Sequence, residues 1–391
     1  MLDAVYADAE AALAETVREA HDAATPLEII GGGTRRALGR PVQSETTIST
    51  ANLTGISFYE PGALTLVAGA GTPLAEVEAA LDAEGQRLPF EPMDHRALLG
   101  TKGEPTVGAV AAMNNSGPRR IQAGAARDAM LGVRLIDGRG EVIRNGGRVM
   151  KNVTGYDLVK LMGGSWGTLG VLTEIAFKVL PKPETSATVM LSGLDDAKAV
   201  AALSAALGSP YDVNGAAHLP GRKLTAVRIE GFESQIAHRG PALVETLKAF
   251  GAATVVQGGE SDMIWRWVRD AEPFASGEDA VWRVSVKPTE GPKLVEALKA
   301  EGDFEAFYDW GGGLVWLKTP ENAVNRGDAG AALIRAETRA RGGHATLVRA
   351  SAATRAAVDV FEPETAPVAA LTARIRAEFD PKGVLNPGRM G

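Results

Sequence analysis

The residues of this chain best suited to holding a ligand are glycines. Residues 151–183 contain five of them around one aromatic residue, Trp166, directly before an apolar, β-branched segment: Gly155, Gly163, Gly164, Gly167 and Gly170. Glycine is favoured where the backbone needs a positive φ or must lie against something that a Cβ would block. A tight turn between a helix and a strand explains two of these glycines, but not the whole set. The pattern therefore predicts that the backbone here contacts a ligand.

A second glycine run, Gly31-Gly32-Gly33-Thr34, follows a short strand predicted at residues 26–30. Successive N–H groups in such a loop can form a concave site for an anion. Neither standard phosphate fingerprint is complete, because a Rossmann turn needs glycine where Arg36 stands and a P-loop needs Gly-Lys-Ser/Thr. From the residues alone, an anion site and a plain hairpin turn fit this loop equally well.

Short polar residues gather at a third place. The small-residue segment 106–113 closes on Asn114-Asn115-Ser116-Gly117, and Gly124-Ala-Ala-Arg127-Asp128 follows. Asparagine and serine are suited to turns and offer short hydrogen-bonding groups there. Taken alone, Arg127-Asp128 is explained by a solvated ion pair that contributes little stability.

The chain lacks the residues that most metal and redox centres require. It has no cysteine, so it can form no disulfide and can supply no thiolate to an iron–sulfur cluster. Its five histidines are scattered and include no pair four residues apart: His21, His95, His218, His238 and His344. We therefore expect no metal site, and any redox chemistry must reside in a bound organic cofactor.

Length and composition limit the class of protein. A chain of 391 residues predicts two domains, and 45% hydrophobic with 23% charged residues is typical of globular proteins. The net charge of −7 argues against a nucleic-acid partner. No apolar run approaches the roughly 18 residues of a membrane span. The acidic start lacks the features of a signal peptide, so we expect a cytoplasmic protein.

The predicted elements change in character after Pro181-Lys182-Pro183. Before this point we expect a helix at 3–22, a β–turn–α unit from 63 to 85, an irregular loop at 89–105, and a hairpin of strands at 130–137 and 141–144. Beyond it, strands are expected at 187–192, 223–230, 281–287 and 313–318, and helices at 194–207, 240–250, 290–300, 328–341 and 367–378. This alternation predicts a separate α+β domain, ferredoxin-like in its β-α-β-β-α-β order, which could be doubled.

Taken in order, the motifs of the first half resemble the FAD-binding core of the vanillyl-alcohol oxidase/PCMH flavoprotein superfamily. The resemblance is carried by Val107-Gly108, Asn114, Gly117, Gly124-x-x-Arg127-Asp128, Asn152-x-Thr154-Gly155-Tyr156-Asp157-Leu158, Gly164-Ser-x-Gly167-Thr168-Leu169-Gly170-Val171 and Leu180-Pro181-Lys182-Pro183. The ending Phe379-Asp380-Pro381 with Leu385–Met390 resembles the D-2-hydroxyacid dehydrogenase branch. Within that branch, the short chain and the run from Trp310 to Trp316 are most similar to the FAD-binding subunits of glycolate oxidases.

The resemblance implies an α+β fold and a division of the chain. A PCMH-type, two-part FAD-binding domain would span residues 1–185, and a ferredoxin-like α+β cap would span 186–342. Residues 343–391 would then return to the FAD domain.

The resemblance also assigns the cofactor-binding residues. It implies that the backbone of Gly31, Gly32, Gly33 and Thr34 holds the FAD pyrophosphate. Positions lining the flavin and diphosphate are Asn114, Ser116, Gly117, Gly124, Arg127 and Asp128. Gly164, Gly167, Leu169, Gly170 and Val171 would follow the adenosine and ribityl groups, and Gly108 and Asn386 complete the expected site.

Catalytic residues are harder to assign. The branch has a His-x-Gly-Asp-Gly-Asn-x-His run that holds a metal and the substrate, whereas this chain has only Gly343-His344 followed by Arg349 in the comparable place. His344 and Arg349 are the candidates that remain. Five residues apart on one predicted strand, they should point to opposite faces and so not converge on one small substrate.

The resemblance implies a subunit of a multi-subunit glycolate dehydrogenase that converts glycolate to glyoxylate. Its implied partners are a second flavoprotein subunit and an iron–sulfur subunit, which could place the complex peripherally at the inner membrane. Two alternatives stay open: a structural or electron-relay flavin subunit without substrate chemistry, and a stand-alone FAD enzyme acting on another small alcohol.

We predict that the purified chain carries FAD that acid or heat releases. Several relatives in the superfamily attach the flavin covalently to a histidine directly after the glycine loop, and Thr34-Arg35 stand there in this chain. Precipitating the protein and measuring flavin absorbance in the supernatant checks this. A yellow pellet under a colourless supernatant would contradict it.

Overall fold

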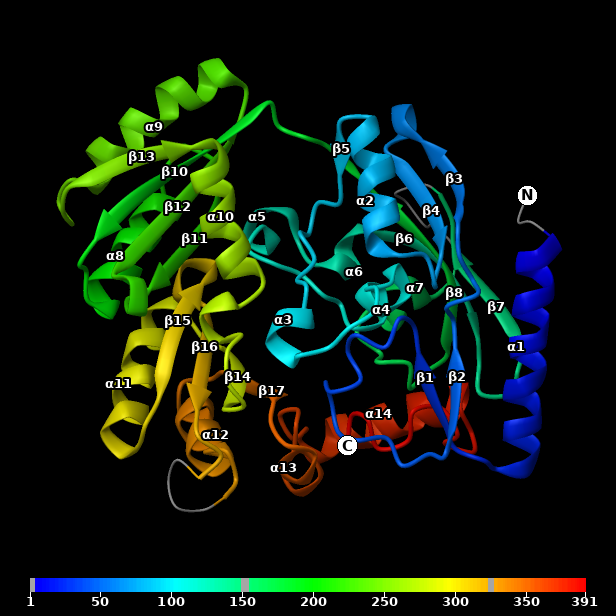
Figure 1. Ribbon diagram of the computed structural model, residues 1–391. Helices are drawn as coiled ribbons and strands as arrows, with labels where there is room; N and C mark the ends of the chain where they lie inside the picture. Colours follow the sequence, from blue (N-terminus) through cyan, green and yellow to red (C-terminus); the bar gives the residue numbers. More distant parts are fainter. Residues whose placement is uncertain (1–3, 149–154, 323–326) are drawn as a thin grey trace.

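Two large β-sheets, two small strand pairs and the helices around them make up the described part of the protein (Figure 1). The computed structural model describes residues 4–148, 155–322 and 327–391. Asn152 and Thr154 of the predicted FAD motif therefore lie outside the described residues. In Figure 1 the smaller sheet lies at the right and the larger one at the left, with the short helices of residues 96–129 between them.

The N-terminal part is built on a five-stranded antiparallel sheet. Its order is β3-β4-β8-β6-β7, with β3 Ile56–Glu60, β4 Thr65–Gly69, β6 Met130–Ile136, β7 Val142–Gly146 and β8 Val171–Lys178. Its helices are α2 Leu74–Ala83, α3 Arg96–Leu99, α4 Val107–Ala112, α5 Arg120–Ala123, α6 Ala126–Ala129 and α7 Leu158–Met162. Apolar residues of the central strands, such as Leu66, Ile175 and Phe177, are fully buried against several of these helices. Burial of this apolar surface drives formation of the domain.

A small parallel pair extends this part. Strands β1 (Leu27–Ile30) and β2 (Thr46–Ser49) pair in parallel, and the helix α1 (Ala4–Ala23) packs beside them. The late part of the chain returns here after α13 (Ala352–Ala357) and α14 (Ala366–Phe379), since Leu385 forms a bridge with Leu27. A two-stranded pair of β5 (Gln86–Arg87) and β9 (Leu180–Pro181) completes the N-terminal part.

The second part is one eight-stranded sheet made of two similar units. The first unit runs β10 Thr185–Ser192, α8 Asp196–Leu207, β11 Val213–Leu219, β12 Leu224–Gly231, α9 Glu233–Leu247 and β13 Ala253–Gln257. The helix α10 (Gly258–Arg269) leads to the second unit: β14 Ala280–Ser285, α11 Gly291–Glu301, β15 Glu305–Asp309, β16 Leu314–Thr319, α12 Ala331–Ala340 and β17 His344–Arg349. The sheet order β13-β10-β12-β11-β15-β16-β14-β17 joins the units through β11 and β15.

This arrangement confirms the α+β class and the ferredoxin-like pattern, which is present twice. Strands β11, β13 and β15 and helix α10 were not predicted from the sequence. In β11, Gly215 and the alanines weaken the strand pattern. The proposed limits at residues 185 and 342 stay a prediction. In the structure, strand β17 (His344–Arg349) pairs with β14 of the large sheet.

A buried charge network joins the two parts. Arg228 of β12 donates two hydrogen bonds to Glu91 of the N-terminal part, at 3.0 and 2.9 Å. Glu230 of the same strand accepts paired hydrogen bonds from Arg87 and from Arg119. Burial alone would raise both carboxyl pKa values, but the facing guanidinium groups lower the pKa of Glu91 to about 2 and that of Glu230 well below its ordinary value. These carboxylates therefore stabilise the fold above the ordinary carboxyl pKa, and the contribution fades as the pH falls towards about 2.

We predict that Glu230→Gln lowers the thermal unfolding midpoint markedly, because breaking a buried ion-pair network costs about 3–5 kcal/mol. Thermal unfolding of the FAD-loaded chain measures the change. Glu305→Gln is the control, since Glu305 pairs with Lys318 at the surface, where one ion pair contributes little. Equal midpoints for the two variants would show that the network does not hold the parts together.

Candidate functional site

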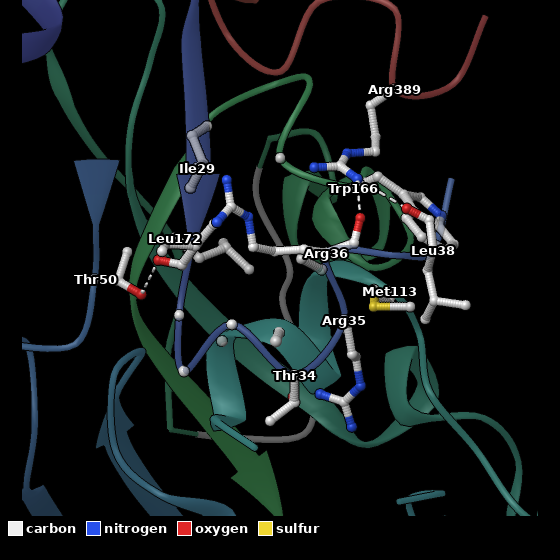
Figure 2. Close-up of a pocket in the computed structure, with 18 of the residues that line it drawn as sticks. Ile29, Thr34, Arg35, Arg36, Leu38, Thr50, Met113, Trp166, Leu172 and Arg389 are labelled. Atoms are coloured by element: carbon white, nitrogen blue, oxygen red, sulfur yellow. Dashed lines mark hydrogen bonds between the residues drawn. The ribbon is translucent and has the colours of Figure 1, made fainter. Parts of the chain in front are cut away.

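A cavity of ≈100 Å³ lies in the N-terminal part, between the glycine loop and the start of α4. Gly31–Thr34, Gly108, Gly167 and Gly170 are the predicted cofactor residues that line it. Figure 2 shows the glycine loop running along the cavity after β1, with Leu38, Met113 and Trp166 gathered at one end. The structure thus brings the glycine loop at 31–34, Gly108 and the glycine motif around Gly167 and Gly170 to one place.

The glycine loop offers unused hydrogen-bond donors to this cavity. The backbone N–H groups of Gly31–Thr34 donate to no atom of the described residues. Gly31–Gly33 are half-buried and Thr34 is buried, so these N–H groups are free to donate to a ligand that enters the cavity. Arg35 adds a cation: its Nη1 is buried without a partner among the described residues, and burial lowers the pKa of Arg35 to about 10, which leaves it charged at neutral pH. Amide groups and a cation together suit a phosphate group.

The glycines of this loop are there for different reasons. Gly33 has a φ of +75°, and a Cβ added to it would meet nothing within 4 Å. A Cβ on Gly32 would instead lie 1.8 Å from the carbonyl oxygen of Glu104, and one on Gly31 would lie 2.3 Å from Thr106 Oγ1. The loop is therefore pressed against residues 104–106 on one side, while Gly33 leaves the other side open.

Asn386 ties the two halves of the cavity wall together. Its Oδ1 accepts from the N–H of Ile29 at 2.8 Å, and its Nδ2 donates to the carbonyl oxygen of Trp166 at 2.9 Å. Gly167 has a φ of +71°, and a Cβ there would lie 2.7 Å from Asn386 Nδ2. Asn386 thus positions the walls of the cavity from behind and is not itself part of the lining.

Gly170 lines the cavity, but its lack of a side chain serves protein packing. A Cβ at this position would lie 2.5 Å from Leu135 Cδ1 on β6. The neighbouring predicted residues Leu169 and Val171 are buried. Gly164, with a φ of +95°, donates from its N–H to the carbonyl oxygen of Ala111 and does not line the cavity.

The predicted residues between 114 and 128 form a turn network of their own. Asn114 Oδ1 accepts from the N–H of Arg127 at 2.8 Å, Ser116 Oγ from that of Ala126, and Asp128 Oδ2 from that of Ala125. Gly124 supports this turn with a φ of +81°. The N–H of Gly117 donates to the carbonyl oxygen of Phe90. None of these residues lines the first cavity, and their direct contact with a cofactor remains a prediction.

A second cavity of ≈60 Å³ adjoins the first, because Leu38, Met113 and Trp166 line both. Its far wall is the large sheet, where Arg283 of β14 lies between Trp316 of β16 and Thr346 of β17 in the strand register. The near wall includes His95, Asn115 and Ser116. The second cavity thus lies between the two parts of the protein.

The two catalytic candidates from the sequence do not line either cavity. Strand β17 begins at His344 and ends at Arg349. Arg349 donates from Nε to the carbonyl oxygen of Asp279 and from Nη1 to that of Leu98. Arg349 therefore holds loops in place.

The structure instead brings His95 and Arg283 to one cavity. A lone charge within the apolar strand 280–285 was the available signal for Arg283, and the irregular loop around His95 gave none.

Within the described ranges, no group of three or more His, Cys, Asp or Glu side chains is placed to hold a metal ion. Over the same ranges, no helix combines the length and apolar character needed to cross a bilayer.

Comparison with known proteins identifies a family model and relatives that this chain is similar to. Residues 3–146 match the family model described as "FAD binding domain". The chain is 36% identical over 388 residues to the glycolate oxidase subunit GlcE of Escherichia coli K12, covering 98% of this chain and 97% of that protein. It is also 34% identical over 143 residues to the glycolate oxidase subunit GlcD of Bacillus subtilis 168, covering 37% and 27% of the two chains.

Solved structures show the same fold at low identity. A 4-ethylphenol oxidase from Gulosibacter chungangensis is similar with a TM-score of 0.71 at 14% identity, covering 98% of this chain and 87% of that one. An alkyldihydroxyacetonephosphate synthase gives a TM-score of 0.69 at 16% identity, covering 96% and 75%.

We predict that Gly33→Val abolishes FAD binding while Gly85→Val does not. Both glycines have a positive φ, +75° and +62°, and open space where a Cβ would stand, so the substitutions strain the backbone similarly. Only Gly33 lines the cavity. Flavin content per chain after purification measures the difference. Full FAD content in Gly33→Val would remove the loop from the cofactor site.

Proposed function

Because the chain belongs to the family of the glycolate oxidase subunit GlcE, we propose that it is the FAD-binding subunit of a multi-subunit glycolate dehydrogenase. The observation that carries the proposal is the row of open amide groups at Gly31–Thr34, lining a cavity within a chain that matches that subunit over nearly its whole length.

The residues of the first cavity fit FAD. Open amide groups of Gly31–Thr34 would hold the pyrophosphate, with the charge of Arg35 nearby. Apolar residues at the end of the cavity, Met113 and Trp166, would contact the less polar end of the cofactor. Bound FAD supplies an acceptor for the hydride that an alcohol loses when it is oxidised to a carbonyl compound.

The protein around the second cavity would exclude water and bind the substrate. Leu38, Met113 and Trp316 are apolar and close this space between the two parts. Excluding water strengthens electrostatic contacts inside a site and protects the bound cofactor from side reactions. The position of this cavity beside the first one makes it the proposed substrate site.

Electrons must leave the flavin through other subunits. The chain has no cysteine with which to ligate an iron–sulfur cluster. We therefore propose an iron–sulfur subunit and a second flavoprotein subunit as partners, with localisation in the cytoplasm or at the inner membrane through them. The similarity to subunits named GlcE and GlcD supports a multi-subunit assembly.

One observation favours the alternative of a flavin subunit without its own substrate turnover. A general base must reach the hydroxyl proton of the substrate with a free lone pair. His95 is the histidine that lines the second cavity, and its Nδ1 already accepts from Arg35 Nε at 3.3 Å. Burial, together with the charges of Arg35 and Arg283, also lowers the pKa of His95 well below its ordinary value. His95 is therefore a poor proton acceptor.

We predict that glycolate reduces the flavin of the isolated chain slowly or not at all, because this cavity lacks an effective base. Anaerobic addition of glycolate, followed by flavin absorbance, measures the rate. In the assembled complex, His344→Ala should change glycolate oxidation by less than about tenfold, since His344 does not line the cavity. Rapid bleaching of the isolated chain that His344→Ala abolishes would contradict both expectations.

A further inference from the structure

Among the described residues, Arg283 of β14 has no carboxylate or hydrogen-bond partner, and it lines the second cavity. It is the only charged residue of β14, and its Cζ lies 5.0 Å from the centre of the Trp310 ring. No carboxylate oxygen of the described residues lies within the 4.0 Å of an ion pair, and no described atom accepts a hydrogen bond from it. Burial and the nearby charge of Arg120 lower the pKa of Arg283 to about 10, so it is charged at neutral pH.

The side chain of Arg283 is half-buried, and part of its accessible surface faces the second cavity. A charge removed from water destabilises the fold unless an opposite charge or several hydrogen bonds compensate. Asp309 is the carboxylate whose charge acts on Arg283, but it forms no ion pair with it. Burial raises the pKa of Asp309 to about 7, and its Oδ1 accepts from the N–H of Trp310 at 2.7 Å. Within the described residues, the compensating anion for Arg283 is therefore missing.

The guanidinium group belongs to the lining of the second cavity, which contains no Asp or Glu. A cavity of ≈60 Å³ holds a few water molecules. It therefore matches a ligand of only a few non-hydrogen atoms. Arg283 lies beside Trp316 and Thr346 on the sheet face that forms the wall. The opposite wall adds the polar residues Asn115 and Ser116, and the rest of the lining is mostly apolar.

His95 supplies a hydrogen-bond donor on the opposite wall. Because Nδ1 accepts from Arg35 Nε, the neutral imidazole carries its proton on Nε2. The carbonyl oxygen of Met93 lies near the imidazole and raises its pKa, but no described residue makes a close hydrogen bond to Nε2, and His95 is only 7% exposed. A buried donor left open towards a cavity is satisfied when a ligand oxygen enters.

We propose that Arg283 and His95 form a binding site for a small monocarboxylate in the second cavity. The guanidinium group offers two parallel N–H donors to a carboxylate, and His95 offers a third to an oxygen of the same ligand. The apolar residues around them limit the ligand to a short acid. The choice of glycolate as the probe rests on the proposed function, whereas the charge and size of the ligand follow from the cavity.

Calorimetric titration of the purified, FAD-loaded chain tests the site. Glycolate should bind at one site, and glycolamide, which has nearly the same shape without the charge, should not. Arg283→Met should weaken glycolate binding by about 30-fold or more, because a buried charge loses its counter-charge. Arg283→Lys keeps the charge but loses the paired donors, so we expect a loss of about tenfold.

Arg120→Met is the matched control. Arg120 also stacks on Trp310, with its Cζ 4.9 Å from the ring centre, but it does not line the cavity. Its removal should change glycolate affinity by less than about threefold. Thermal unfolding separates binding from structure: Arg283→Met should melt at the wild-type temperature or above it, since an unpaired buried charge has been removed.

Two results would overturn the site. One is unchanged glycolate affinity in Arg283→Met or Arg283→Lys, and the other is equal binding of glycolamide. A lower melting temperature with loss of FAD in both Arg283 variants would assign Arg283 a structural role instead. Failure of the proposed function looks different: glycolate would bind in an Arg283-dependent manner, but the assembled complex would not oxidise it.

Discussion

The open amide groups of Gly31–Thr34 are the constraint on which the rest of the structure depends. Unsatisfied N–H groups in a protein interior are unfavourable, so this loop needs both a ligand and a rigid support. Residues 104–106 press on it from one side, and Asn386 holds the facing wall at Ile29 and Trp166. Asn386 follows Leu385, which forms a bridge with Leu27 of β1. The fold thus holds a loop with open donors in place by packing residues 104–106 and Asn386 against its two sides.

The large sheet closes the other side of the site. Two ferredoxin-like units joined at β11 and β15 give a surface long enough to cover the second cavity, and the network of Glu91, Glu230 and Arg228 holds this surface against the N-terminal part. The same strands that provide the network and the wall also form the core of each unit. Rigid strands therefore set the distance between the cofactor cavity and the residues facing it.

Much of this arrangement could be predicted from the sequence, because it depends on local signals. Glycine runs and alternating strands located the loop at residue 31 and a unit that could be doubled. The phosphate-binding role of that loop and the family came from the resemblance of the ordered motifs. Gly170 was predicted to lack a side chain because a ligand lies against its backbone. In the structure, Leu135 occupies the space where its Cβ would stand. Arg283 and His95 could not be paired from sequence: they are nearly two hundred residues apart, and only the packing of a sheet against a loop brings them to one cavity.

The hydrogen bonds of Asn386 have a consequence for the order in which the protein is made. Ile29 and Asn386 are separated by 357 positions, so a growing chain presents the glycine loop long before its support exists. Closing so long a separation is slow compared with forming local turns and helices. Until synthesis passes residue 386, the loop has no fixed wall opposite it. The wall that Asn386 holds is therefore completed only when the end of the chain has joined the N-terminal part.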